Sequence, residues 1–386
     1  MTIILRQSRA ARSPRPLGAG RALRAAMACA LVGAVGMGLA AGLVGCAAGG
    51  GVAENGAGSA DAATATRAFT AMDTGMTLTV HAADQAAADG AADACQQRVR
   101  ELDALLAPAG EGSELARANA AGGAPVEVSA SVGALVDEAL DAARETGGAF
   151  DPTVYPLTDA WGFTDGNHRV PAPDEIAALL ARVGYGAVQV DEAAGTITLD
   201  GGAQIDVGGV AKGFAADELS ALLRERGVAS ALFDLGGNVT ALGSKPDGSP
   251  WKVGIADPSA PDRLAGALSV QDATVSTSGA YQRFFDEGGT RYHHLLDPAT
   301  GYPAASDLAS VSAVGPNGAR CDALSTACYV LGTEGALALW RAADGEDAFD
   351  LVLVGNDGSV RVTEGVAASF EAAEGYAGRV SIEERP

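Results

Sequence analysis

Few side chains in this sequence can carry out a proton transfer, because the chain has only four histidines. Two of them, His293 and His294, are adjacent and precede an Asp297-Pro298 turn. A histidine titrates near neutral pH and can take a proton from a hydroxyl group. Neighbouring side chains of a strand point to opposite faces, so these two cannot both line one pocket. Alone, the motif fits either a catalytic base or a structural hydrogen-bonding residue.

A second candidate site lies in the segment Cys321-Asp322-Ala323-Leu324-Ser325-Thr326, which opens an apolar stretch that continues to Leu331. Asp322 and Thr326 are four residues apart, so they share one face if the segment is helical. Their carboxylate and hydroxyl oxygens are ligands that Mg²⁺ prefers. An aspartate in the first turn of a helix also complements the helix dipole, and the pattern leaves that simpler explanation open.

The third candidate is a glycine-containing segment that is expected to join the end of a strand to the start of a helix. Its sequence is Ile205-Asp206-Val207-Gly208-Gly209-Val210-Ala211-Lys212-Gly213-Phe214. Glycines let a ligand approach the backbone, a helix N-terminus favours an anion, and Lys212 adds a positive charge. The segment is not a Walker loop and lacks the full dinucleotide-binding glycine spacing. It therefore predicts either a phosphate-binding site or an ordinary tight turn.

Three further segments contain residue types that a generic core does not need, although each has a purely structural explanation. They are Gly148-Ala149-Phe150-Asp151-Pro152-Thr153-Val154, Leu235-Gly236-Gly237-Asn238 and Ser276-Thr277-Ser278-Gly279. The first follows a predicted helix, where Gly147 and Gly148 suit a left-handed C-terminal cap. In the second, Gly236 and Gly237 leave the backbone accessible.

Hydrophobic periodicity predicts the elements that must position these segments. Apolar residues recur at helical spacing in residues 91–106, 131–146, 174–183 and 215–226. Short β-hairpins are expected at 187–190 with 196–199 and at 351–354 with 360–362. Helices and hairpins are interspersed between about residues 69 and 362, with no second linker or internal repeat. This pattern favours a single α+β domain over a doubly wound parallel sheet.

The composition excludes several classes of protein. The chain has 386 residues, of which 48% are hydrophobic and 19% charged, so it can build a large core and is too apolar for wholesale disorder. Six arginines are the only charged residues before Cys46, and the rest of the chain carries 20 basic and 48 acidic side chains, a net charge of −28. Such a surface repels phosphate backbones, so no nucleic-acid partner is expected. A phosphorylated ligand would need a metal ion, a well-placed lysine or backbone N–H groups.

The first residues are typical of an export signal. An apolar run at residues 25–44 follows six arginines, which are Arg6, Arg9, Arg12, Arg15, Arg21 and Arg24. The run ends in Leu43-Val44-Gly45-Cys46, which resembles a lipobox and predicts a lipoprotein signal peptide at 1–45 with a lipidated Cys46. The alternative is an N-terminal transmembrane helix with an incidental cysteine. Either one predicts a body held at the cell membrane on its extracytoplasmic face.

After the export signal, residues 46–66 are small, polar and low in complexity, which predicts a flexible tether before a folded domain at 67–386. The three later cysteines, Cys95, Cys321 and Cys328, are odd in number and match no metal-binding spacing. We expect all three to be small buried hydrophobic residues.

The chemically suggestive segments are more specific as an ordered set than one by one. The set is Phe150-Asp151-Pro152-Thr153-Val154, Trp161-Gly162-Phe163, Asp206-Val207-Gly208-Gly209-Val210-Ala211-Lys212-Gly213, Leu235-Gly236-Gly237-Asn238, Ser276-Thr277-Ser278-Gly279, His294-Leu295-Leu296-Asp297-Pro298 and Asp322-Ala323-Leu324-Ser325-Thr326. In this order they resemble the ApbE family, the FAD:protein FMN transferases, over about residues 72–331. The resemblance implies an α+β domain related to the T-fold, with mixed or antiparallel sheets and packed helices, and members of the family are often bacterial lipoproteins.

The resemblance also implies the chemistry: binding of FAD and Mg²⁺, transfer of the FMN moiety to a Thr or Ser hydroxyl of an acceptor protein, and release of AMP. The flavin-nucleotide contacts that it implies are Met72, Ala149, Phe150, Asp151, Asp206, Lys212 and Leu296. The metal ligands that it implies are the Gly209 carbonyl, Asp322, Ser325 and Thr326, with His294 as the base. A pyrophosphate among acidic residues needs a divalent cation, and a hydroxyl is a poor nucleophile until a base takes its proton.

The sequence departs from the family pattern at three positions. Asp73 replaces the glycine of a Met-Gly-Thr motif, Ala109 stands where an aromatic residue is frequent, and Tyr155 stands where glycine is usual. None of these positions is among the implied metal ligands.

The expected acceptor is an extracytoplasmic flavoprotein, such as the FMN-binding domain of a Rnf- or Nqr-type redox subunit or of a secreted reductase. Two other functions stay open. One is an FAD pyrophosphatase, in which water replaces the hydroxyl and FMN and AMP are released. The other is a lipoprotein that binds FAD without chemistry, although pure binding would not require a base. A structural surface lipoprotein would leave the ordered motifs unexplained.

Overall fold

A computed structural model of the chain describes residues 2–3, 62–345 and 348–386. Of the predicted signal peptide it describes only Thr2 and Ile3, which form the strand β1 (Thr2–Ile3). Cys46 and the predicted tether as far as residue 61 lie outside the described residues. Within the described ranges, no helix combines the length and the apolar character needed to span a bilayer.

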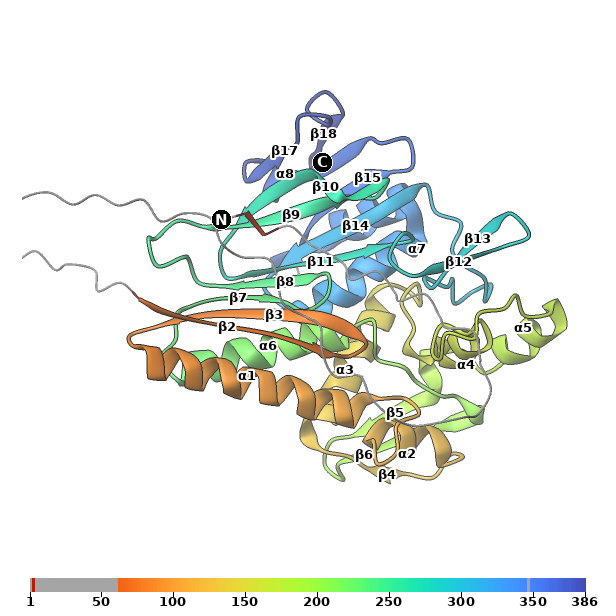
Figure 1. The fold of residues 1–386 in the computed structure, drawn as a ribbon. Helices are drawn as coiled ribbons and strands as arrows, with labels where there is room; N and C mark the ends of the chain where they lie inside the picture. The colour runs from red at the N-terminus through yellow and green to blue at the C-terminus, as the bar shows by residue number, and fades with distance from the viewer. Residues whose placement is uncertain (1, 4–61, 346–347) are drawn as a thin grey trace, which may run out of the picture. The chain divides into compact units, whose positions relative to one another are not determined.

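A nine-stranded sheet runs through the centre of the fold (Figure 1). Its strands, in order across the sheet, are β18 (Val380–Glu383), β16 (Val360–Thr363), β15 (Asp350–Gly355), β14 (Leu308–Gly315), β11 (Ala273–Gly279), β8 (Asn238–Leu242), β7 (Ser230–Asp234), β3 (Thr74–Ala82) and β2 (Ala63–Ala71). All neighbours pair antiparallel except β16 and β18, which are parallel. The sheet is therefore mixed, as the sequence predicts.

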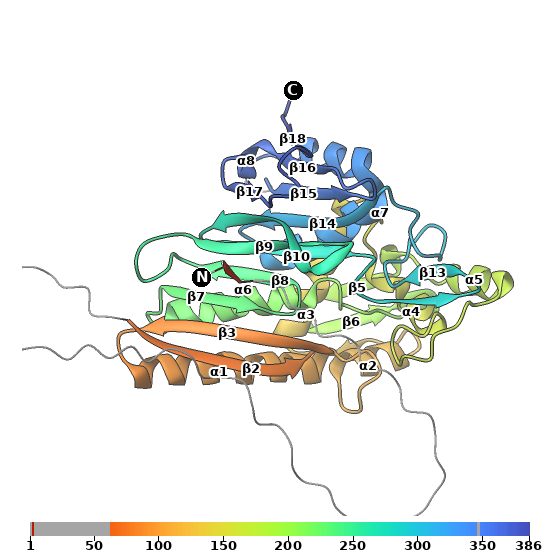
Figure 2. The same ribbon diagram turned by 45° about the horizontal axis from the view of Figure 1, so that its top comes forward.

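Successive residues of the central strands pack on different layers, because side chains alternate between the faces of a sheet. In β15, Leu351 and Leu353 belong to the hydrophobic cluster that contains helix α7 (Gly318–Ala342). Their neighbours Val352 and Val354 instead pack with the second sheet, whose strands are β1, β9 (Trp251–Asp257), β10 (Ala260–Val270) and β17 (Phe370–Ala372). Figure 2 shows β9 and β10 lying across one face of the central sheet.

Three longer helices cover the other face of the central sheet: α1 (Gln85–Leu106), α6 (Ala211–Glu225) and α7, and a fourth, α3 (Ala130–Glu145), packs against α7. Leu78 of β3, Leu102 of α1 and Leu219 of α6 are fully buried in one cluster. The remaining elements are α2 (Glu114–Ala120), α4 (Tyr155–Ala160), α5 (Pro173–Leu180), α8 (Glu364–Ala367), a three-stranded sheet of β4 (Val126–Glu127), β6 (Thr196–Leu199) and β5 (Val188–Asp191), and a hairpin of β12 (Phe284–Glu287) and β13 (Thr290–His293).

The structure confirms the α+β class and both predicted hairpins, β5–β6 and β15–β16. The predicted helices correspond to α1, α3, α5 and α6, but α6 begins at residue 211 rather than 215 and so includes Lys212 in its first turn. The tether prediction is wrong for residues 63–66, which form the start of β2, because an alternating Ala-Thr pattern suits a strand at the edge of the sheet.

The three cysteines are buried and unpaired, as predicted. Burial raises the pKa of the Cys95 thiol to about 12, and it raises the pKa of Cys321 and Cys328 as well. The three side chains are therefore neutral thiols at physiological pH and serve as core residues.

Helices α6 and α7 cross with their backbones in contact at two glycines. A Cβ atom on Gly213 would lie 2.0 Å from the carbonyl oxygen of Gly318, and one on Gly318 would lie 2.5 Å from the carbonyl oxygen of Gly213. The carboxylate of Asp217 in α6 accepts the backbone N–H groups of Gly318 at 2.8 Å and Ala319 at 2.9 Å. These bonds satisfy N–H groups that the first turn of α7 leaves without an intrahelical partner.

Substitution of Gly213→Ala is expected to destabilise the fold by about 1–3 kcal/mol, because the new methyl group meets backbone that cannot rotate away. The matched control is Gly90→Ala in α1, where a Cβ meets nothing within 4 Å. That change should stabilise the protein by about 0.5–1 kcal/mol, since alanine favours a helix interior. Urea unfolding of the two variants measures both effects, and equal stability of Gly213→Ala and wild type would show that the two helices can separate.

Candidate functional site

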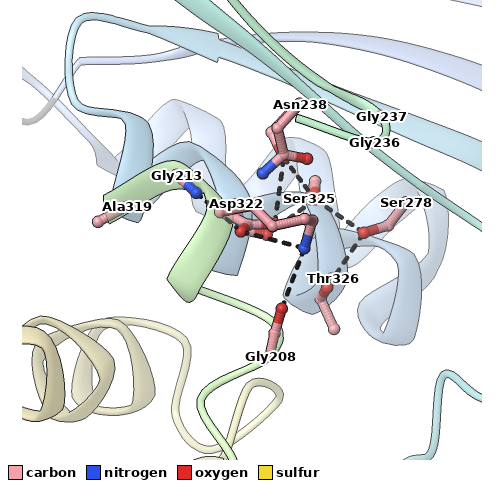
Figure 3. A network of polar contacts seen from close by, with 12 residues as sticks. Gly208, Gly213, Gly236, Gly237, Asn238, Ser278, Ala319, Asp322, Ser325 and Thr326 are labelled. Carbon is pink, nitrogen blue, oxygen red and sulfur yellow. Dashed lines mark hydrogen bonds and ion pairs between the residues drawn. The ribbon is translucent and has the colours of Figure 1, made fainter. Parts of the chain in front are cut away.

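A buried carboxylate, that of Asp322, lies at the centre of a polar network in the first turns of α7 (Figure 3). One oxygen, Oδ2, accepts the backbone N–H of Gly213 at 3.1 Å and lies 3.4 Å from the ammonium group of Lys212. The other oxygen, Oδ1, lies 3.4 Å from the hydroxyl oxygen of Ser276, whose proton is donated to the nearer Oδ1 of Asn238. The contact between α6 and α7 is what brings Gly213 and Lys212 to this carboxylate.

Lys212 connects the glycine-containing loop to α7. Its Nζ donates to the carbonyl oxygen of Gly208 at 3.0 Å as well as lying near Asp322. The side chain is only 20% exposed, so its charge is little screened by water. An ammonium group held in this way adds a fixed positive charge at the N-terminus of α6, where an anion is already favoured.

Hydroxyl groups form the wall of the site beside Asp322. Ser278 of β11 lies 2.8 Å from the Ser325 hydroxyl and 3.1 Å from the Thr326 hydroxyl, both in α7. Ser325 also donates to the backbone carbonyl of Asp322 at 2.8 Å. The structure thus brings together Asp322, Ser325 and Thr326, the three side chains for which the family resemblance implies metal ligation.

Asn238 adds an amide to this wall. Its Oδ1 accepts the hydroxyl of Ser276 at 2.9 Å, which leaves the amide nitrogen as the free end. Asn238 is 1% exposed, and its Nδ2 has no hydrogen-bond partner among the described residues. A buried N–H donor without a partner is costly, and a ligand oxygen at this position would satisfy it.

Asp206 lies in the loop that precedes α6, with Oδ1 accepting the backbone N–H of Gly208 at 2.8 Å. Burial raises the pKa of this carboxyl, and the charge of Asp73 raises it further, whereas the Gly208 N–H and the charges of Arg283 and Lys212 lower it. Asp73 and Met72 form the tight turn between β2 and β3, with φ of +57° and +47°. The Met72–Asp73 turn is therefore close enough to act on Asp206, and Met72 packs against the core beneath it.

Phe150 lies against the same loop. Its ring is so close to Gly209 that a Cβ atom there would lie 2.9 Å from a ring carbon, so this position requires glycine or a displaced ring. The next residue, Asp151, uses both carboxylate oxygens within the chain: Oδ1 accepts the Thr153 N–H at 2.8 Å and Oδ2 the Tyr185 N–H at 2.9 Å. Asp151 therefore fixes the backbone that presents Ala149 and Phe150.

Leu296 has its side chain buried in an apolar cluster with Trp161 and Phe163. Its backbone forms an isolated β-bridge with Pro303. Asp297, which follows it, accepts the Ala299 N–H at 2.9 Å and stabilises a turn. The side chains of Leu296 and Asp297 thus stabilise the local fold, so a ligand would contact the backbone of Leu296 rather than its side chain.

His294 lies at the base of the β12–β13 hairpin. Its Nδ1 is 3.2 Å from the carbonyl oxygen of Arg283, and a carbonyl can only accept, so this contact requires a proton on Nδ1 and leaves the lone pair on Nε2. The ring of His293 turns elsewhere and meets Tyr329 edge-on at 5.6 Å. The two histidines therefore separate, as the strand pattern predicts.

The expectation that His294 titrates near neutral pH is wrong for this structure. Burial lowers the pKa of the ring to about 3, with further lowering by the charges of Arg283, His293 and Lys212, although the bond to the Arg283 carbonyl raises it. His294 is consequently neutral across the physiological range. It can accept a proton in this state, but burial and the nearby positive charges make it a weak base.

The sequence assigns no role to three residues of this polar site: Asn238, Ser276 and Ser278. Their segments stand out as Leu-Gly-Gly-Asn and Ser-Thr-Ser-Gly, yet each has a sufficient structural explanation. The spacing of Ser276 and Ser278 does carry a usable signal, because residues two apart in a strand face the same side. No pattern in the sequence shows that this side faces α7.

The donor set fits a magnesium ion that a phosphorylated ligand completes. Within the described residues, no three His, Cys, Asp or Glu side chains gather at one point, so the protein offers one carboxylate with hydroxyl and carbonyl oxygens. Mg²⁺ is commonly bound by one or two carboxylates together with substrate phosphates and water. Asp322 and Thr326 would supply the side-chain oxygens of such a site.

Comparison with known proteins gives a consistent result. A family model described as the ApbE family matches residues 72–349. An FAD:protein FMN transferase of Treponema pallidum is 40% identical over 284 residues, which cover 69% of this chain and 78% of that protein. An ApbE protein of Thermotoga maritima has a similar solved structure, with 31% identity, a TM-score of 0.73, and coverage of 78% of this chain and 97% of that one. The apo form of the Pseudomonas stutzeri flavinyl transferase ApbE is similar as well, with 29% identity and a TM-score of 0.71. The match covers 81% of this chain and 98% of that one.

The low pKa of His294 predicts a pH-dependent stability. The unfolded chain has an ordinary histidine pKa of about 6.5, so it binds the proton before the folded state does. Above about pH 6.5 this group does not change the free energy of unfolding. As the pH falls from there toward 3, the free energy of unfolding decreases by about 1.4 kcal/mol per pH unit. Urea unfolding of wild type and His294→Gln at about pH 7.5 and 5.5 isolates the effect, since glutamine does not titrate. A constant stability difference between the two proteins would place the pKa near its ordinary value.

Proposed function

The chain belongs to the ApbE family, and on that premise we propose that it is an FAD:protein FMN transferase. The observation that carries the proposal is the convergence of Lys212, Asp322, Ser325 and Thr326, in a chain that is 40% identical to a protein bearing that name. A buried cation, a carboxylate and hydroxyl oxygens in one place suit a diphosphate ligand better than any apolar substrate.

The reaction that we propose breaks one bond and forms another at the FMN phosphorus of FAD. A Thr or Ser oxygen of the acceptor attacks this phosphorus, the bond to the AMP phosphate breaks, and AMP leaves. The hydroxyl proton goes to Nε2 of His294, the nitrogen that the bond between Nδ1 and the Arg283 carbonyl leaves free. FAD and the acceptor are thereby converted into the flavinylated acceptor and AMP.

Asp322 and Thr326 would hold a Mg²⁺ ion, with Ser325 and the carbonyl of Gly209 beside them. The ion, when bound, neutralises negative charge on the phosphate oxygens of the transferring and leaving groups. Lys212 supplies a second positive charge from the N-terminus of α6, and the unpartnered amide of Asn238 supplies an N–H donor. Phe150, Ala149 and the Met72 turn form the apolar and backbone surface on which the flavin would rest.

Binding of FAD makes His294 a stronger base. Burial is the largest cause of the low pKa of the ring, and the charges of Arg283, His293 and Lys212 lower it further. A diphosphate near Lys212 and Arg283 cancels part of their positive potential, so we expect the pKa to rise by part of the shift that these charges cause.

The acceptor that we propose is an extracytoplasmic flavoprotein with an FMN-binding domain, on a membrane redox subunit or a secreted reductase. The chain would work from the membrane surface through a lipid on Cys46, because its export signal ends in Leu43-Val44-Gly45-Cys46. A lipid anchor limits the search for the acceptor to the same membrane face.

Substitution of Asp322→Ala is expected to reduce transfer at least about 100-fold, because it removes the carboxylate that would hold the metal and leaves Lys212 uncompensated. Mass spectrometry of an FMN-binding acceptor domain, incubated with the chain, FAD and Mg²⁺, measures the added FMN mass and the released AMP. The matched control is Asp174→Ala, an exposed aspartate in the first turn of α5, which should leave transfer unchanged. Chelation by EDTA should reproduce the Asp322→Ala result.

Substitution of His294→Ala tests the base in the same assay, and this variant should bind FAD but lose transfer.

Other outcomes of that assay would support the alternative functions or contradict the proposed metal site. Free FMN and AMP without an adduct would support the pyrophosphatase, and intact FAD held without turnover would support a flavin-binding lipoprotein. Full transfer by Asp322→Ala would remove the proposed metal site.

The anchor has its own test. Substitution of Cys46→Ser is expected to move the protein from the membrane fraction to the soluble fraction of cells that export it, because the lipid-bearing thiol is absent. Mass spectrometry of the wild-type N-terminal peptide should show the lipid on Cys46. Membrane retention of the variant, with residues 1–45 still attached, would support a transmembrane segment instead.

A further inference from the structure

The β12–β13 hairpin holds Arg283 directly opposite His294. The strands pair with Phe284 opposite His293, and the next pair continues this register, since the His294 N–H donates to the Arg283 carbonyl at 3.1 Å. The same carbonyl accepts from Nδ1 of His294 at 3.2 Å. The backbone of Arg283 therefore fixes both the position and the tautomer of the candidate base.

The guanidinium group of Arg283 contacts the segment that follows α4 and, among the described residues, forms no ion pair with an acidic side chain. One of its nitrogens donates to the carbonyl oxygen of Phe163, whose ring lies 6.3 Å from that of His294. Among the described residues, no ion pair involves Arg283. The other arginine of the hairpin, Arg291, pairs with Asp286 at 3.1 Å and lies 3.8 Å over the ring of Phe284.

An unpaired arginine is informative in so acidic a chain, which has 48 acidic and 26 basic side chains. Carboxylates are plentiful, yet the guanidinium of Arg283 is held by a neutral carbonyl that uses only part of its five N–H donors. The remaining donors can form paired hydrogen bonds with a phosphate group, which matches the planar fork of a guanidinium.

Two positive charges are near both Asp206 and His294. Arg283 and Lys212 each lower the pKa of both groups, and a charge has this effect only when it is close. Lys212 comes from α6 and contacts Asp322, whereas Arg283 comes from the hairpin and contacts the segment after α4. The two cations therefore reach this region from different elements, and a diphosphate bound near Asp206 and His294 would be attracted by both.

We propose that Arg283 binds the diphosphate of the flavin nucleotide opposite Lys212 and is a catalytic residue of this site. The inference rests on the proposed function and deepens it, because it assigns phosphate recognition to a side chain outside the segments that carry the family resemblance. Negative charge moves onto the bridging oxygen as the bond to AMP breaks, and a guanidinium at the diphosphate stabilises that charge without moving. Through its carbonyl, the same residue positions His294.

Equilibrium binding of FAD, FMN and riboflavin to the full chain tests the proposal, with flavin fluorescence as the readout. In Arg283→Gln, the affinity for FAD and FMN should fall about 10- to 100-fold, the usual effect of losing a hydrogen bond to a charged group. The affinity for riboflavin, which has no phosphate, should be unchanged. Arg283→Lys should recover part of the loss, since it restores the charge but not the fork. Arg291→Gln, the matched control on the same hairpin, should bind all three flavins as wild type does.

Equal losses for riboflavin and FAD in Arg283→Gln would overturn the proposal, because they would mean that the side chain only supports the Phe163 segment. Unchanged FAD affinity would overturn it as well, and a change confined to the KM for the acceptor would show that Arg283 binds the acceptor. If Arg283→Gln does not fold, the same comparison of flavins with Arg283→Lys decides. Phosphate-dependent binding without any transfer would refute the proposed activity and leave the role of Arg283 in place. Transfer by an Arg283→Gln variant with wild-type FAD affinity would support the proposed activity and refute the role of Arg283.

Discussion

The burial of one carboxylate shapes the rest of this structure. Asp322 is 3% exposed, and a carboxylate buried without hydrogen-bond donors would destabilise the fold by several kcal/mol. Two donors prevent this, the Lys212 ammonium and the Gly213 N–H, while the Ser276 hydroxyl oxygen lies 3.4 Å away. Both donors belong to α6, so α6 and α7 must approach until their backbones touch, and only glycine permits that at residues 213 and 318. Packing of the two helices and the charge of the site are therefore a single constraint.

The same logic explains the arrangement of charge around the site. A chain whose body carries a net charge of −28 repels an anionic nucleotide at long range, although salt screens much of this repulsion beyond about 10 Å. Within the site the few nearby positive charges dominate, because low polarity strengthens interactions at short distance. Lys212 is shared between the Gly208 carbonyl and the Asp322 carboxylate, whereas Arg283 donates to the neutral carbonyl of Phe163, which leaves its charge available. A carboxylate in place of the Phe163 carbonyl would have satisfied Arg283 and reduced its affinity for phosphate.

The sequence predicted the parts of this site that depend on spacing along the chain. Asp322 and Thr326 on one helical face, glycines before the helix that carries Lys212, and the separation of His293 from His294 all follow from local periodicity. Contacts across the fold did not follow: no local pattern shows that Ser276, Ser278 and Asn238 face α7, or that Gly213 touches Gly318. The start of the domain was also misplaced, because residues 63–66 are compositionally simple and become a strand only by pairing with β3. The protonation of His294 depends on burial and on the charges of distant residues, so a reference pKa was a poor guide to it.

The neutral state of His294 has a consequence for the order of events that the proposed reaction would follow. In the chain alone, Nε2 is a weak base, so a hydroxyl or water molecule that enters the site early gains little help from it. A diphosphate that reduces the positive potential of Lys212 and Arg283 makes the ring more basic, while burial, the largest cause of its low pKa, stays in place. The base is then strongest when the phosphorus to be attacked is already in place. Water can use the same base at that stage, and the fate of the flavin therefore depends on how completely the acceptor excludes water when it brings its hydroxyl to Nε2.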